Sequence, residues 1–290
     1  MRPEFEWKLR SRSLKLGPRT LIMGIVNVTP DSFSDGGQFF EPERAVAHGL
    51  TLLAEGADIL DIGGESTRPG KKDPVSADEE KRRVLPVMEG IHRQVQDAII
   101  SIDTYKAETA EAAIDRGADI INDVSGFTWD ADMLPLLASA DCGCVLMHTR
   151  GYPEEWQTMP SLAGAEVLPL VLDALRDLSR RAVAGGIARE RIVLDPGFGF
   201  GKRLDENFPV LAHLSDLQTL GFPLLTGSSR KSFVARASGS NSSDRDSARL
   251  AGSIASLTAS ILGGAQIVRV HDVKDSVAAA KIADAIVNSE

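Results

Sequence analysis

The sequence predicts an α/β protein built as one (β/α)8 barrel, the TIM-barrel fold, with a short N-terminal β-hairpin cap. Eight short runs rich in Ile, Val and Leu alternate with eight helical patterns along the 290 residues. One strand with its helix recurs roughly every 33 residues, which is the spacing of a (β/α)8 barrel. The apolar runs are continuous rather than alternating, as is typical of parallel strands covered on both faces.

The predicted strands cover residues 20–28, 58–64, 98–104, 119–125, 143–149, 191–197, 222–228 and 266–272. The predicted helices cover residues 42–57, 76–95, 107–116, 131–140, 165–184, 206–219, 247–263 and 273–288. Ser76 and Glu79 have the spacing of a capping box at a helix start. Residues 4–16 alternate apolar and polar side chains before a Gly-Pro turn, which indicates a hairpin. Residues 1–19 are therefore predicted as the cap and residues 20–290 as a single barrel.

An open doubly wound sheet is the main alternative, because it explains the same alternation of strands and helices. That fold carries an early glycine fingerprint for a nucleotide. The one rich glycine cluster in this chain is late, at Gly197 to Gly201 followed by Lys202. Its spacing matches neither GxGxxG nor GxxxxGK[ST], so the barrel is favoured.

The composition is that of a globular protein with an acidic surface. A net charge of −9 argues against nucleic acid or an anionic membrane as a partner. No apolar run approaches the roughly 18 residues of a membrane span, and the N-terminus lacks a signal-peptide pattern, so we expect a cytoplasmic protein. Cys142 and Cys144 are too close in sequence for a structural zinc pair and are interpreted as buried reduced thiols.

Polar side chains gather at the carboxyl ends of the predicted strands, where barrel enzymes carry their active sites. Asp103 and Asp123 are also compatible with helix capping, and His148 with a satisfied core histidine. Asp195 is followed by Pro-Gly rather than a helix, and Arg269 needs an anion or aromatic partner in a barrel mouth. The set is Asn27, Asp61, Glu65, Asp103, Asn122, Asp123, His148, Asp195, Arg230, Lys231, Arg269, His271 and Asp272.

Two features of this end of the barrel indicate an anionic substrate. Loops 29–37 and 63–74 are rich in Gly, Pro and hydroxyl residues and are predicted as lids. With Asn27 as an oxygen ligand, the basic residues suggest a phosphate or diphosphate with Mg²⁺. These basic residues are Arg68, Lys202, Arg230, Lys231 and Arg269.

The remaining acceptors, Asp103, Asn122 and Asp195, suit a different ligand. Carboxylate and amide oxygens around a pocket match a flat heterocycle with amino and N–H donors. A pterin or a guanine-like edge has this pattern of donors.

Six strings follow one another between about residues 20 and 288. They are IVNVTPDSFSDGG (25–37), DIGGESTRPG (61–70), IIND (120–123), LDPGFGFGK (194–202), SRKS (229–232) and RVHDVK (269–274). In these strings the chain resembles the dihydropteroate synthases, folate-pathway enzymes of the pterin-binding barrel superfamily. The resemblance covers most of the chain.

The resemblance implies the activity and a residue set for each subsite. A dihydropteroate synthase condenses 6-hydroxymethyl-7,8-dihydropterin diphosphate with p-aminobenzoate, releasing 7,8-dihydropteroate and diphosphate, and it is a sulfonamide target. The implied pterin site is Asp103, Asn122, Met147, Asp195, Phe200 and Lys231, of which Asp103, Asp195 and Lys231 are assigned to catalysis. The implied diphosphate site is Asn27 with Mg²⁺, Thr67, Arg68, Arg269 and His271. The implied p-aminobenzoate site is Phe33, Thr67, Pro69, Ser229 and Lys231.

Three alternatives stay open at this point. A pterin- or folate-dependent methyltransferase of the same superfamily would not need the STRPG loop or the SRKS and RVH strings. A non-catalytic pterin-binding paralogue would be expected to have eroded loops. A metallohydrolase using His148, Asp195 and His271 lacks the usual HxH pair on its first strand.

Two further expectations concern the pocket and the assembly. Tyr105 and the Thr149-Arg150 pair depart from the residues frequent in the family, which bears on pocket packing. Helix 247–263 is rich in Ala, Ser and Leu around most of its circumference, which is consistent with a homodimer, and the resemblance implies the same.

Overall fold

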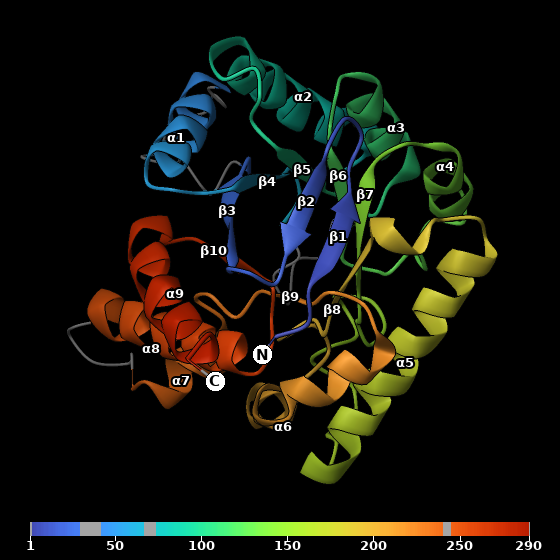
Figure 1. The fold of residues 1–290 in the computed structure, drawn as a ribbon. Coiled ribbons are helices and arrows are strands. Elements are labelled where there is room, and N and C mark those ends of the chain that lie inside the picture. The colour runs from blue at the N-terminus through green and yellow to red at the C-terminus, as the bar shows by residue number, and fades with distance from the viewer. Residues whose placement is uncertain (1, 30–41, 67–73, 240–244, 290) are drawn as a thin grey trace.

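The computed structural model describes residues 2–29, 42–66, 74–239 and 245–289, and the chain folds as the predicted barrel (Figure 1). Each strand of the barrel lies inside its predicted segment. The strands are β3 (Leu21–Asn27), β4 (Ile59–Gly63), β5 (Ile100–Asp103), β6 (Ile120–Asp123), β7 (Gly143–Met147), β8 (Ile192–Asp195), β9 (Leu225–Thr226) and β10 (Ile267–Val270).

The eight strands are parallel and follow the order β8-β7-β6-β5-β4-β3-β10-β9. A parallel bridge between Leu194 and Leu224 joins the two ends of this order. The Leu194 amide also donates to the Pro223 carbonyl at 2.9 Å. The sheet therefore curves into a nearly closed barrel, whose strands direct all their carboxyl ends to one face.

Helices cover the outside of the barrel (Figure 1). They are α1 (Pro42–Ala54), α2 (Ala77–Gln94), α3 (Ala107–Asp115), α4 (Met133–Ser139), α5 (Gly164–Ala184), α6 (Asn207–Ala212), α7 (Ser232–Ala237), α8 (Arg245–Leu262) and α9 (Val273–Val287). Ser76 caps α2 as predicted, accepting from the Glu79 amide at 3.2 Å. No described helix is long and apolar enough to cross a membrane.

Two helical segments differ from the prediction. Residues 206–219 are not one helix, because α6 ends at Ala212 and a 3-10 helix, η4 (Leu214–Leu220), follows it. The backbone of His213, between them, lies outside the helical region. Helix α7 was not predicted, since its six residues are too few to show a helical period.

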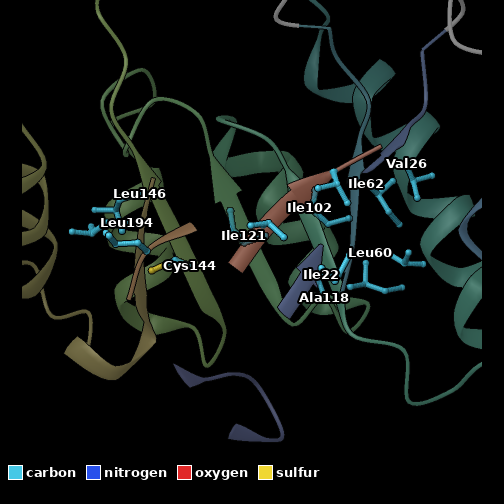
Figure 2. Close-up of a cluster of buried hydrophobic side chains, with 14 of the residues drawn as sticks. Ile22, Val26, Leu60, Ile62, Ile102, Ala118, Ile121, Cys144, Leu146 and Leu194 are labelled. Atoms are coloured by element: carbon cyan, nitrogen blue, oxygen red, sulfur yellow. The ribbon is translucent and has the colours of Figure 1, made fainter. Parts of the chain in front are cut away.

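The strands are buried on both faces, and each face has its own core. Outward side chains such as Ile22, Leu60, Ile102 and Leu146 pack between the sheet and the helices (Figure 2). Cys144 lies in this outer core, and both cysteines are free and buried. The apolar character of both faces explains why the strands appear as continuous apolar runs in the sequence.

The hairpin of β1 (Phe5–Lys8) and β2 (Ser13–Leu16) closes the amino-terminal end of the barrel. Trp7 is fully buried, and its indole N–H donates to the Arg191 carbonyl at 2.9 Å. Trp7, Leu9 and Leu16 pack with inward side chains near the amino ends of the strands: Leu21, Met23, Ile59, Ile120, Val145, Val193, Leu225 and Ile267. This end of the barrel interior is thus filled with apolar side chains, which leaves the opposite end for polar chemistry. The division into residues 1–19 and 20–290 stays a prediction.

Candidate active site

The interior of the barrel changes from apolar to polar along each strand. Side chains two residues apart share a face of a strand, so the residues that follow the apolar inner cluster by two positions also point inward. On β10, Arg269 follows Ile267 in this way, and on β4 Asp61 follows Ile59. Asn122, Met147 and Asp195 occupy the same level on β6, β7 and β8.

Arg269 is the centre of this polar layer. Its Nε lies 2.6 Å from Asp61 Oδ2, and its Nη2 lies 2.6 Å from Asp103 Oδ2. Asn122 Nδ2 donates to the same Asp61 oxygen at 3.1 Å. Asp61 is fully buried, and its Oδ1 has no hydrogen-bond partner within the described part of the chain. Side chains from four strands therefore meet in one hydrogen-bonded group.

The charges in this group alter one another's protonation. Burial raises the pKa of Asp103 to about 7, although the Arg269 guanidinium opposes the shift. Burial acts to lower the pKa of Arg269, but the Asp61 and Asp103 carboxylates outweigh it and raise that pKa above its ordinary value. Arg269 therefore stays charged while Asp103 titrates near neutral pH.

A second polar pair lies at the ends of β8 and β9. Asp195 is 5% exposed, and its Oδ1 accepts from the Gly197 amide at 2.7 Å. Burial raises the pKa of Asp195 to about 6, against the opposing effects of that hydrogen bond and of Lys231. Burial and the nearby Arg269 lower the pKa of Lys231 to about 8, and its ammonium lies 4.0 Å from the centre of the Phe200 ring.

His271 and Ser229 form a smaller unit beside Arg269. His271 Nδ1 lies 3.1 Å from Ser229 Oγ, which also accepts from the His271 amide at 3.3 Å. Arg230, predicted as part of the basic cluster, instead pairs with Asp272 through an Nε–Oδ2 distance of 3.0 Å. Its side chain is 45% exposed, so Arg230 lies apart from the charged group at the mouth.

The contacts of Asp103 and Asp123 show whether each of them has a structural role. Asp103 does not cap α3, because the N-cap residue of that helix is Lys106. The Asp123 carboxylate accepts from the Ser125 and Phe127 amides at 2.6 and 3.1 Å. Asp123 therefore fixes the turn after β6 and does not face the mouth as a free acceptor.

Comparisons with known proteins identify the family of this chain. A family model described as "Pterin binding enzyme" matches residues 23–271. The dihydropteroate synthase of Clostridium beijerinckii is 42% identical over 97% of this chain and 99% of its own length. That of Bacillus subtilis is 41% identical over 95% and 92%. The chain belongs to the pterin-binding enzymes and, among them, to the dihydropteroate synthases.

Solved dihydropteroate synthases have the same fold as this chain. The Xanthomonas albilineans enzyme with 4-aminobenzoic acid is 42% identical, covers 98% of both chains and has a TM-score of 0.88. The Yersinia pestis enzyme with a sulfonamide drug is 40% identical, covers 99% and 100%, and has a TM-score of 0.88. The Burkholderia cenocepacia enzyme with 7,8-dihydropteroate is 36% identical, covers 100% and 98%, and has a TM-score of 0.85. As a dihydropteroate synthase, this chain is a transferase of folate biosynthesis.

The structure brings together most of the residues expected in a dihydropteroate synthase site. Asp103, Asn122, Asp195, Lys231 and Arg269 share the polar layer or its rim, with Met147 buried beside Asp195 in the β7–β8 register. Asn27 ends β3, next to β10. Phe33, Thr67, Arg68 and Pro69 lie outside the described residues.

Asp61 belongs to the site, but it is absent from the pterin, diphosphate and p-aminobenzoate residues expected from the sequence. It stands at a predicted strand end, but nothing in the sequence pairs it with a residue 208 positions later. Its spacing of two from Ile59 was the available signal, because it places Asp61 on the inward face together with the other mouth residues.

Proposed function

We propose that the mouth of this dihydropteroate synthase binds the dihydropterin at Asp103, Asn122 and Asp195 and the diphosphate at Asn27, Arg269 and His271. The observation that supports the proposal is the direct contact between the two residue sets, through Arg269 and Asp103. A ligand with a donor-rich ring and an attached anion would match acceptors and cations placed this close together. Thr67 and Arg68 would complete the diphosphate site. The residues that would face p-aminobenzoate are Phe33, Thr67, Pro69, Ser229 and Lys231.

Arg269 can keep a carboxylate and still bind an anion. Only its Nε and Nη2 donate in the described part of the chain, to Asp61 and Asp103. A guanidinium has five N–H donors, so those on Nη1 remain for diphosphate oxygens. Asp61 would hold the guanidinium in place while the anion arrives.

Mg²⁺ fits the site only as an ion shared with the substrate. The described residues contain no group of three or more His, Cys, Asp and Glu side chains that could hold a metal. Magnesium commonly uses one or two protein oxygens, with water and substrate phosphates completing its shell. The Asn27 side-chain oxygen would be its protein ligand, and the ion would neutralise diphosphate charge when bound.

The reaction then needs no nucleophile from the protein. The bond between the pterin methylene carbon and the diphosphate oxygen breaks, and its electron pair leaves on the diphosphate. Arg269 and His271 stabilise that negative charge, while Asp195 and Asp103 stabilise the positive charge left on the dihydropterin. The amine nitrogen of p-aminobenzoate forms the new C–N bond and loses a proton to the released diphosphate.

The experiment that tests this function is a product balance. Purified protein is incubated with the dihydropterin diphosphate, p-aminobenzoate and Mg²⁺, and both products are quantified by chromatography. We expect dihydropteroate and diphosphate in equal amounts. Diphosphate release without dihydropteroate would refute the synthase function.

The pKa values of the mouth residues predict a bell-shaped pH profile. Asp195 and Asp103, with pKa values of about 6 and about 7, must be ionised to hold pterin N–H groups, so kcat/KM falls as the pH drops through this range. Lys231, with a pKa of about 8, must be protonated, so kcat/KM also falls at higher pH. Initial rates between pH 5 and 9.5 measure both limbs. A flat profile across pH 6–8 would contradict the assigned roles.

We also propose that the chain forms a homodimer through α8 and α9. These two helices pack side by side (Figure 1) and leave Leu262, Ile282 and Ile286 exposed by 48%, 65% and 48%. Ala251 and Ala255 on α8 are exposed as well. Exposed apolar side chains on neighbouring helices are typical of a subunit interface.

Ile282→Asp tests this dimer by placing a charge at its most exposed apolar residue. We expect sedimentation velocity to show a dimer for the unmodified chain and a shift to monomer for the variant. Val183→Asp, at a 42% exposed position on α5, is the matched control and should stay dimeric. A monomer for the unmodified chain would refute the proposal.

A further inference from the structure

Lys202 is a buried cation that the reaction described above does not use. It is 3% exposed. Its Nζ lies 2.9 Å from His148 Nδ1 and 3.2 Å from the Phe200 carbonyl, and it forms no ion pair with a carboxylate of the described residues. Burying a charge without a direct partner is strongly unfavourable, so its presence here calls for a use of that charge.

His148 is the neutral partner that orients Lys202. Its other ring nitrogen bonds to the Pro196 carbonyl, and burial together with Lys202 lowers its pKa well below the ordinary value. The ring is therefore neutral, with Nε2–H donating to Pro196 and Nδ1 accepting from Lys202. The His148 amide donates to the Asp195 carbonyl at 2.9 Å. His148 thus links Lys202 to the backbone carbonyl groups of Asp195 and Pro196.

The segment from Asp195 to Lys202 is packed tightly onto this pair. Gly197 has a φ of +66°, and a Cβ there would lie 2.0 Å from the His148 carbonyl oxygen, so no other residue fits. Asn207 holds the same segment with neutral groups: its Oδ1 accepts from the Gly199 amide at 2.7 Å, and its Nδ2 donates to the Lys202 carbonyl at 3.2 Å. The segment that carries Asp195 and Phe200 therefore has one charged anchor and one neutral anchor.

The charged anchor acts on Asp195 as well. Burial lowers the pKa of Lys202 to about 7, and Asp195 is the main group that opposes this shift. Glu206 opposes it too, whereas Lys231 and Arg150 add to it. Burial raises the pKa of Asp195, and the opposing charges are Lys231, Arg269 and Lys202. Of these three cations Lys202 is the buried one, whereas Lys231 and Arg269 are partly exposed.

We propose that Lys202 and His148 are positioning residues for the reaction, a buried pair that fixes the 195–202 segment and holds a positive charge behind the Asp195 carboxylate. The proposal rests on the proposed role of Asp195 as a pterin acceptor. Neither residue touches substrate. The pair would keep the carboxylate oriented toward the mouth and ionised at and below neutral pH, where Lys202, with a pKa of about 7, carries its charge.

The test compares Lys202→Met, Lys202→Arg and Asn207→Ala. Lys202→Met removes the charge, Lys202→Arg keeps it, and Asn207→Ala loosens the same segment without changing any charge. For each variant we would measure the affinity for 6-hydroxymethylpterin by calorimetry, the pH profile of kcat/KM and the thermal midpoint. His148→Asn, which keeps an acceptor for Lys202 but removes the donor to Pro196, replaces Lys202→Met if that variant does not fold.

We expect Lys202→Met to raise the pKa of Asp195 on the acidic limb by about one unit and to weaken pterin binding about tenfold near pH 5, below both the original and the shifted pKa. Lys202→Arg should retain the acidic limb and the pterin affinity of the unmodified protein. Asn207→Ala should leave the acidic limb in place even where it lowers the thermal midpoint. His148→Asn should weaken pterin binding in the same direction. An unmoved limb in Lys202→Met, or an equal shift in Asn207→Ala, would overturn the proposal. If the unmodified protein neither binds the pterin nor forms dihydropteroate, the proposed function itself fails.

Discussion

Replacing Asp195 with asparagine is expected to lower kcat/KM for the dihydropterin substrate by about 10²–10³-fold, the effect of removing one preorganised charge-stabilising group. Asparagine keeps the size of the side chain and an oxygen that can accept from Gly197. It removes the negative charge that would stabilise the developing cation. The acidic limb of the pH profile should also lose the contribution from the group with a pKa of about 6. Steady-state rates with varied dihydropterin diphosphate measure both effects.

Asp119→Asn is the matched control for Asp195→Asn. Asp119 is also a buried aspartate at a strand end, 4% exposed, and it accepts from the Ile100 amide at 3.1 Å. It precedes β6, at the amino-terminal end of the barrel, opposite the mouth. Its replacement should change the thermal midpoint but not the KM for the pterin. If Asp195→Asn retained full activity, or if both variants lost activity equally, Asp195 would not be a catalytic residue.

Arg269→Met is expected to have two effects: weaker binding of diphosphate and a less stable fold. The variant leaves the Asp61 and Asp103 carboxylates without their cation, and breaking such a buried pair from one side costs about 3–5 kcal/mol. Unpaired buried carboxylates have folded-state pKa values above the unfolded ones. The variant's stability deficit should therefore be smallest at low pH and grow as the pH rises through neutrality. Urea unfolding at several pH values and diphosphate titration measure the two effects.

Arg2→Met separates these two effects. Arg2 is a buried arginine at the far end of the barrel, paired with Asp284 at 3.0 Å with its side chain 2% exposed. Its replacement should also destabilise the fold, yet leave the affinity for diphosphate unchanged. The double variant Arg269→Met with Asp103→Asn should recover part of the stability, since one of the two carboxylates left unpaired is then removed. An unchanged diphosphate affinity in Arg269→Met would show that the anion binds elsewhere.

The barrel could be predicted from the sequence because its signal is local. Most strands are short apolar runs rich in Ile, Val and Leu that are buried on both faces, and helices such as α2 and α5 are long enough to show their period. Helix α7 has only six residues and starts directly after Lys231, so its pattern is too short to recognise. The hairpin was predictable from alternation, but its contact with Arg191 was not.

The candidate site could be predicted as a set of residues but not as a set of contacts. Strand position places Arg269, Asp61 and Asp103 at one end of the barrel. Which side chains meet across the mouth depends on barrel closure. Closure brings Arg269 into contact with Asp61 and Asp103, which precede it in the sequence by 208 and 166 positions. The pairing of His148 with Lys202 likewise depends on how the 195–202 segment folds back, and no local pattern encodes it.

The most direct test of the account is the position of an anion in a crystal of this protein grown with 6-hydroxymethylpterin and diphosphate. We predict that the diphosphate contacts Arg269 and His271 while the pterin ring hydrogen-bonds to Asn122 and Asp195 on the opposite side of the mouth. An anion bound away from Arg269, for example among the Lys81, Arg82 and Arg116 side chains that line the surface between α2 and α3, would contradict it.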